Sequence, residues 1–143
     1  MSDFLCIDIK TLDNGGVHFC LTVLIRKVLE VTGMEHCDGF PTLTKVEAPL
    51  GTDENGSEDK RDWPNSHASV IGMMLYLASN TRPDISFAVH QCARFTHNTK
   101  SSHETALKRI CRFLQGTNNN SLVFNPSKKL LVDCYADAEF AGL

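Results

Sequence analysis

The chain has 143 residues, the length of one ordinary domain or of two fragments of larger ones. Hydrophobic residues make up 42% and charged residues 22%, which excludes wholesale disorder and a collagen-like or coiled-coil chain. No run reaches the roughly 20 apolar residues that a membrane helix needs, and the N-terminus lacks the pattern of a secretory signal. We therefore expect an intracellular protein, cytoplasmic or nuclear, that contacts no membrane and keeps its six cysteines reduced.

Charge is unevenly distributed along the chain. The net charge is −3, but the window 82–116 carries +4 and the remainder −7. A local basic surface in an acidic protein favours a polyanionic partner, although a solvated helix face has the same composition. Both interpretations stay open on charge alone.

The first 33 residues predict a β-hairpin followed by a helix. Apolar and polar residues alternate over 5–10, the pattern of a half-buried strand. The turn residues 13–16 tolerate positive φ, and a returning strand is expected over 17–21. The apolar spacing over about 22–32 is that of an amphipathic helix, which Gly33 ends.

Residues 37–65 are predicted to form a long surface loop. The segment is rich in proline and glycine, and its part 53–62 carries five acidic and two basic residues. Such a composition has little apolar surface to bury. The loop is therefore the best candidate for a boundary within the chain.

Three closely spaced helices are predicted after this loop. The first, over about 66–79, is apolar almost all round and should be the central buried helix. The second begins near Thr81, whose hydroxyl can cap it. The third begins at Ser101, whose spacing to Glu104 is that of a capping box.

Residues 122–124 and 130–140 are predicted strands of a C-terminal β-hairpin. Asp137 and Glu139 fall on one face of the second strand, where they could hold a divalent cation or simply face solvent. The predicted fold class is therefore α+β: an N-terminal β-hairpin and helix, a long loop, a three-helix bundle and a C-terminal β-hairpin.

Basic residues cluster on the second and third predicted helices. Arg94 lies on a polar face of the second helix, and Lys108, Arg109 and Arg112 crowd the C-terminal half of the third. Cations there stabilise the negative end of the helix dipole without any ligand. The alternative is a surface that follows nucleic-acid phosphates.

Several segments resemble one known family, the Pol polyprotein of copia-type retrotransposons, at the passage from reverse transcriptase into ribonuclease H. These segments are SVIGMMLYLA at 69–78, TRPDISFAV at 81–89, ALKRICRFLQGT at 106–117 and YADAEFAG at 135–142. In addition, DFLCI at 3–7 resembles the strand that follows the polymerase active site. The resemblance spans nearly the whole chain, in the expected order.

This resemblance implies an organisation for the chain. Residues 1–36 would be the palm-to-thumb hairpin and helix, 37–65 an acidic linker, 66–117 a thumb-like region, and 118–143 the truncated start of a ribonuclease H-like sheet. The expected partners are an RNA–DNA or DNA duplex, bound through its phosphates, and the remaining Pol segments. The residues expected to contact the duplex are Arg82, Arg94, Lys108, Arg109 and Arg112.

The resemblance also implies an incomplete catalytic centre. Asp137 matches the first metal-binding carboxylate of the ribonuclease H, which would hold Mg²⁺ only in the complete enzyme. The polymerase motif Tyr-x-Asp-Asp does not occur in the 143 residues. We therefore expect the isolated chain to catalyse nothing and to need no cofactor. The alternative is a non-enzymatic helical interaction module, derived from a retroelement, that binds a protein through the helix carrying Met73 and Met74.

Overall fold

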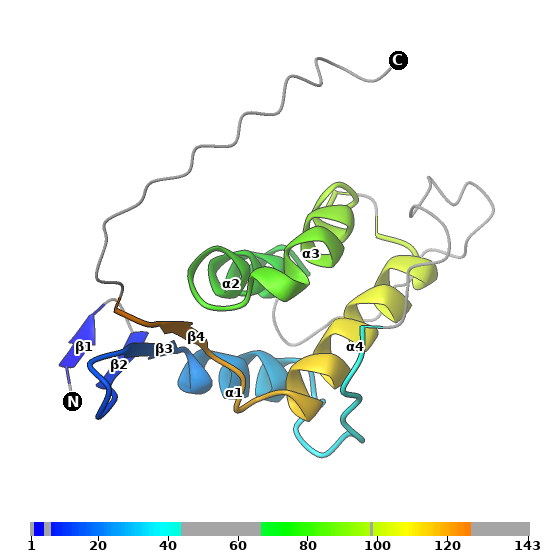
Figure 1. The fold of residues 1–143 in the computed structure, drawn as a ribbon. Coiled ribbons are helices and arrows are strands. Elements are labelled where there is room, and N and C mark those ends of the chain that lie inside the picture. The colour runs from blue at the N-terminus through cyan, green and yellow to red at the C-terminus, as the bar shows by residue number, and fades with distance from the viewer. Residues whose placement is uncertain (1, 5–6, 44–66, 98, 127–143) are drawn as a thin grey trace, which may run out of the picture.

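The computed structural model describes residues 2–4, 7–43, 67–97 and 99–126 (Figure 1). These residues form a small antiparallel sheet and four α-helices. The strands, in sheet order, are β1 (Ser2–Phe4), β2 (Ile7–Thr11), β3 (Val17–Cys20) and β4 (Leu122–Phe124). The helices are α1 (Thr22–Val31), α2 (His67–Asn80), α3 (Ser86–Ala93) and α4 (Ser101–Gly116). The expected mixture of helices and antiparallel strands is confirmed.

The predicted hairpin is present as β2 and β3. Ile9 pairs with Phe19 across the ladder, and the turn places Gly15 at a φ of 81°. A positive φ is open to glycine without the steric cost that a Cβ brings. The Asn14 side chain accepts the Gly16 N–H at 2.9 Å, which closes the turn. The alternation of apolar and polar residues did not predict β1, which pairs antiparallel with β2.

Strand β4 joins the N-terminal sheet, a pairing that the sequence did not predict. It pairs antiparallel with β3, and Leu122 lies opposite Phe19, whereas the predicted hairpin with 130–140 falls on residues outside the described ranges and stays a prediction. The Phe19 and Phe124 rings meet edge to face, with their centroids 5.4 Å apart, an arrangement that aromatic pairs favour. The chain after α4 therefore returns to the N-terminal sheet. Residues 127–143 lie outside the described ranges.

Helix α2 is the centre of the core, as its apolar composition predicts. Val70, Met74 and Leu77 have no exposed surface, and α2 packs against both α1 and α3. Helix α1 also contacts α4, and its buried face belongs to the same hydrophobic cluster as α2, α3 and α4. None of the helices in the described ranges is long and apolar enough to cross a membrane.

Two predicted helix caps are wrong. The second helix starts with a 3₁₀ turn η1 (Pro83–Ile85) that continues into α3, and the buried hydroxyl of Thr81 has no hydrogen-bond partner. At the start of α4, Nδ1 of His103 accepts the Lys100 backbone N–H at 3.0 Å. Glu104 instead forms an ion pair with Lys108. A residue three positions into the helix does close the turn, but it is His103.

The start of the predicted surface loop packs tightly on α4. The backbone N–H of Phe40 donates to the Arg112 carbonyl at 3.0 Å. Gly39 lies so close to Gly116 that a Cβ on Gly39 would stand 2.5 Å from the Gly116 Cα. Residues up to 43 thus form part of the helical unit, whereas 44–66, which include the acidic stretch, lie outside the described ranges.

Candidate nucleic-acid interface

Helix α4 presents two basic side chains to solvent. Its apolar face, which includes Leu107 and Ile110, is buried in the core. Arg109 and Arg112 are exposed and form no ion pair with a carboxylate of the described residues. Their charges are therefore available to a ligand.

Lys108 is less available than its neighbours. Its ammonium group forms an ion pair with Glu104 one turn earlier on α4, and its side chain is only partly exposed. Glu104 itself is 6% exposed, so the pair sits at the edge of the core. A ligand phosphate would have to compete with this carboxylate for Lys108.

Arg94 lies just after α3, close to the start of α4. It is exposed, and its guanidinium lies 5.8 Å from the centroid of the Phe95 ring. That ring stacks on the His103 imidazole with centroids 4.4 Å apart. The hydrogen bond from Arg94 to Gln91 Oε1 is long, at 3.4 Å. This arrangement leaves the charge of Arg94 open to solvent.

Arg82 does not lie on this surface. Only 2% of the residue is exposed. Its Nε and Nη2 atoms donate to the Asp84 carboxylate at 3.0 and 2.8 Å. Its Nη1 and Nη2 atoms also donate to the carbonyl and the hydroxyl of Thr117, at 3.0 and 2.7 Å. The structure therefore uses Arg82 to tie η1 to the end of α4, with its donors directed inward.

The ring of Phe113 completes the surroundings of Arg82. The guanidinium carbon lies 5.3 Å from the ring centroid, a distance at which the ring face attracts a cation. A buried charge is stabilised only when it is paired and hydrogen-bonded, and Arg82 meets both conditions. The resemblance implied a phosphate contact for Arg82, but its burial and inward hydrogen bonds give it a structural role.

His67, at the start of α2, gives the fold a dependence on pH. Burial, and after it the nearby His103, lowers the pKa of His67 below the ordinary value of 6.5. Neither ring nitrogen has a hydrogen-bond partner. The unfolded chain takes up a proton more readily, so the free energy of unfolding should fall as the pH drops below about 6.5 and level off below the folded-state pKa.

Urea unfolding at a series of pH values checks this expectation. In the wild type, the urea concentration at the unfolding midpoint should decrease below about pH 6.5, and in a His67→Gln variant this decrease should be smaller. The matched control is His90→Gln, because His90 is exposed on α3 and its replacement should leave the fall intact. Equal pH profiles in the wild type and the His67→Gln variant would contradict the assignment.

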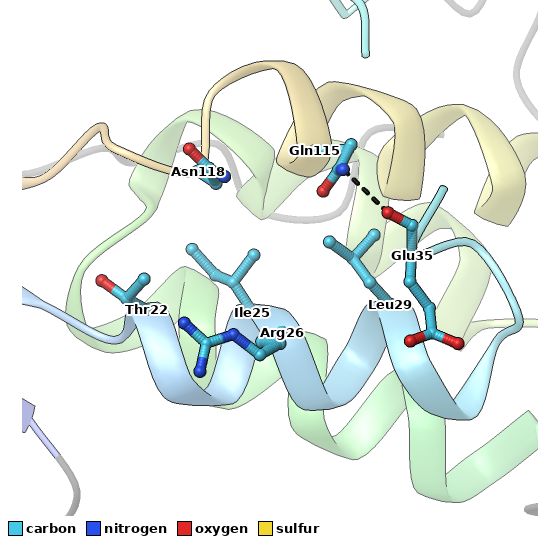
Figure 2. A pocket seen from close by; sticks show the side chains of 7 residues that line it. All are labelled: Thr22, Ile25, Arg26, Leu29, Glu35, Gln115 and Asn118. Carbon is cyan, nitrogen blue, oxygen red and sulfur yellow. Dashed lines mark hydrogen bonds between the residues drawn. The ribbon is translucent and has the colours of Figure 1, made fainter. Parts of the chain in front are cut away.

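A pocket of about 210 Å³ lies between α1 and the C-terminal end of α4 (Figure 2). Ile25 and Leu29 of α1 form its apolar wall. The Gln115 side-chain amide donates to the Glu35 carbonyl at 2.9 Å, which joins the loop after α1 to α4. The other polar residues that line it are Thr22, Arg26, Glu35 and Asn118. Sequence reasoning missed this site, because none of these residues forms a local motif.

The buried thiols of Cys92 and Cys111 are not nucleophiles. Burial raises the pKa of Cys92 and of Cys111 to about 11, so both stay protonated at neutral pH. No group of three or more His, Cys, Asp or Glu side chains within the described residues could hold a metal ion. Asp137 and Glu139, the candidate metal ligands, lie outside the described residues.

No protein-family model matches the chain, and no solved structure matches it significantly. Among curated proteins, the chain is 40% identical over 139 residues to the retrovirus-related Pol polyprotein from transposon RE1 of Arabidopsis thaliana. It is 34% identical over 125 residues to the Pol polyprotein from transposon TNT 1-94 of Nicotiana tabacum. An uncharacterized mitochondrial protein of Arabidopsis thaliana is 32% identical over 139 residues.

The chain is homologous to the Pol polyproteins of copia-type retrotransposons. The matches cover 97% of this chain for RE1 and 82% for TNT 1-94. The chain spans only 9% of either polyprotein, and 55% of the mitochondrial protein. It is thus related to one short segment of Pol, and the activities of a whole polyprotein do not transfer to it through similarity alone.

The structure brings part of the predicted basic set of this chain together. Arg109 and Arg112 share the solvent side of α4, and Arg94 lies beyond the N-terminal end of the same helix. Lys108 lies beside them but is paired, and Arg82 is buried. The pocket between α1 and α4 adds Arg26, whose only sequence signal is its place on the polar side of an amphipathic helix.

Proposed function

We propose that this Pol segment is the C-terminal thumb region of a reverse transcriptase, running into ribonuclease H, and that it holds primer–template duplex by its phosphates. The observation that carries the proposal is the exposed pair of cations on α4, Arg109 and Arg112, which form no ion pair within the described residues. The similarity to Pol polyproteins over nearly the whole chain supports it. The proposed ligand is an RNA–DNA hybrid or a DNA duplex.

The spacing of the exposed cations suits an extended polyanion. His103, against which Phe95 and hence Arg94 pack, lies nine residues before Arg112 on α4. At 1.5 Å per residue, this corresponds to about 13 Å along the helix axis. Cations spread over such a length can follow a phosphate backbone, whereas a small anion would need them to converge. Phosphate contacts fix the position of the duplex but read no sequence.

In this proposal, other parts of the polyprotein carry out catalysis. Both nucleotidyl transfer and ribonuclease H cleavage use two metal ions held by several carboxylates. In this proposal Asp137 contributes one Mg²⁺ ligand to a complete ribonuclease H, and the isolated chain is inactive. The remaining Pol segments are its partners, inside the cell.

The interaction-module alternative has less support. It places a protein partner on the helix that carries Met73 and Met74. Met74 has no exposed surface, and Met73 is partly buried against the core. Flexible methionine side chains fill irregular gaps in cores, and these two do so here. The described part of α2 thus offers little of its methionine surface to a partner.

The proposal predicts how hybrid binding depends on salt. Each phosphate contact releases condensed counterions, so the slope of log affinity against log salt measures the number of contacts. Replacing Arg109 and Arg112 together with alanine should reduce that slope by about two units. Lys108→Ala should reduce it by less than one unit, because Lys108 is already paired with Glu104. Fluorescence anisotropy with a labelled RNA–DNA hybrid measures the slope for the wild type, the double variant and Lys108→Ala.

A charge-matched control separates local contact from general attraction. Lys10 on β2 and Lys27 on α1 are exposed and distant in sequence from α4. The Lys10→Ala/Lys27→Ala variant loses the same charge and should keep most of the slope. Hybrids of unrelated sequence should bind with equal affinity. An unchanged slope in the Arg109→Ala/Arg112→Ala variant would rule out these two residues as the contact.

A further inference from the structure

One end of the pocket between α1 and α4 is lined by hydrogen-bond donors. Thr22 and Arg26 are four residues apart on α1, so they lie on one face of the helix. Asn118, just beyond α4, faces them across the pocket (Figure 2). A guanidinium, a hydroxyl and a side-chain amide therefore line this end from two sides, and all three can donate to an anionic oxygen.

The negative charge of the pocket lies elsewhere. Glu35 lines the other end, and its carboxylate is well separated from Arg26 in Figure 2. The Glu35 carbonyl, rather than the carboxylate, accepts the Gln115 amide. Arg26 forms no ion pair within the described residues, and the first turn of α1 contains no acidic residue. The Arg26 end is thus electropositive and unoccupied by a carboxylate of the described part.

The pocket adjoins the proposed duplex surface. Gln115 is three residues after Arg112 on α4, and residues at this spacing are neighbours on a helix surface. Arg112 therefore lies near the Gln115 end of the pocket, on the helix that forms one of its walls. Arg26 lies outside the basic window 82–116, so charge patterning along the chain does not connect it with α4.

We infer that the Arg26 end of this pocket binds one backbone phosphate of the duplex, with Thr22 and Asn118 as additional donors. The inference rests on the proposed function and extends the phosphate track from α4 onto α1. Arginine suits the role because its planar fork of donors matches two phosphate oxygens. Ile25 and Leu29 are buried, so the face of α1 that carries Thr22 and Arg26 is anchored to the core.

Two matched pairs of variants test the inference on the complete chain. Arg26→Ala is compared with Lys27→Ala, which loses the same charge from an exposed neighbour that does not line the pocket. Asn118→Asp is compared with Asn119→Asp, which adds the same charge outside the pocket. Asn119 lines a different groove, together with Pro83 and Asp84. These are exposed residues, and thermal melting of each variant confirms that the fold is kept.

The readout is the salt dependence of binding to a labelled RNA–DNA hybrid. Arg26→Ala should lower the slope by about one unit, and Lys27→Ala by less than half of that. Asn118→Asp should weaken binding clearly more than Asn119→Asp, because a carboxylate in the pocket repels the phosphate. Inorganic phosphate at constant ionic strength should compete only weakly with the hybrid. Strong competition would show that the site prefers free phosphate to a duplex, and would overturn the inference.

The outcomes separate this inference from the proposed function. If the wild type binds the hybrid and Arg109→Ala/Arg112→Ala lowers the slope, but Arg26→Ala equals Lys27→Ala, only the pocket assignment fails. Equal effects of the two aspartate variants would lead to the same conclusion. If the wild type shows no salt-dependent binding, the proposed function fails and the pocket assignment fails with it.

Discussion

Replacing Arg82 with alanine is expected to lower the free energy of unfolding by about 3 kcal/mol, because it breaks a buried, hydrogen-bonded charge pair. The variant leaves the Thr117 carbonyl and hydroxyl without their donor and removes the cation from the Phe113 ring. Asp84 is 40% exposed and can be rehydrated, which keeps the loss at the lower end of the range for buried ion pairs.

Urea unfolding of three variants tests this expectation. Arg82→Lys should lose more than half as much stability as Arg82→Ala, because an ammonium cannot serve Asp84 and Thr117 with the same fork of donors. Arg109→Ala, which removes an exposed arginine from α4, should change stability by less than about 0.5 kcal/mol. A loss below about 1 kcal/mol in Arg82→Ala would contradict the structural role.

The same variant separates stability from binding. At a temperature where Arg82→Ala remains folded, the salt slope for the RNA–DNA hybrid should equal that of the wild type, because the guanidinium does not reach the surface. A slope reduced by about one unit would restore Arg82 to the phosphate-contacting set.

Replacing Gly116 with alanine is expected to cost about 2 kcal/mol, because the new methyl group would overlap backbone. A Cβ on Gly116 would stand 2.7 Å from both the nitrogen and the oxygen of Phe40. The loop must then move off α4 and lose the hydrogen bond from Phe40 to the Arg112 carbonyl. The better helix propensity of alanine, worth at most about 1 kcal/mol, only partly offsets this clash.

A glycine in open surroundings provides the control. Gly72 lies within α2, is exposed, and a Cβ there would meet nothing within 4 Å. Gly72→Ala should therefore raise the free energy of unfolding by about 0.5–1 kcal/mol. Adding Gly39→Ala to Gly116→Ala should cost little more, since both disturb one contact. Stabilisation by Gly116→Ala, or strict additivity of the two glycine variants, would contradict the close packing.

Local sequence patterns predicted the elements whose geometry depends on near neighbours. The turn at Gly15 and the end of α1 at Gly33 both have the positive φ that these glycines suggested. The amphipathic spacing of α1 and α4 and the continuous apolar character of α2 correctly indicated their buried faces. The sequence motifs also identified the Pol relatives that the comparisons then found.

Other features depend on partners distant in the chain. Arg82 donates a hydrogen bond to Thr117, 35 residues away, and β4 pairs with a strand about 100 residues before it. The caps of α3 and α4 were mispredicted because hydroxyl and carboxylate caps were read from spacing alone. In the structure, the Thr81 hydroxyl is buried without a hydrogen-bond partner, and His103 accepts the backbone N–H of Lys100, the residue before α4.

The sequence by itself thus determined the turns, the helices and their buried faces, and the kinship with copia-type Pol polyproteins, because each depends on residue type at short spacing. Only the tertiary structure decided which cations face solvent. Arg82 and Arg109 are the same residue type, and both lie on or beside helices. Packing encloses the first between Asp84, Phe113 and Thr117 and leaves the second exposed. Packing also opened the pocket at Arg26, since burial is set by what the fold places around a side chain.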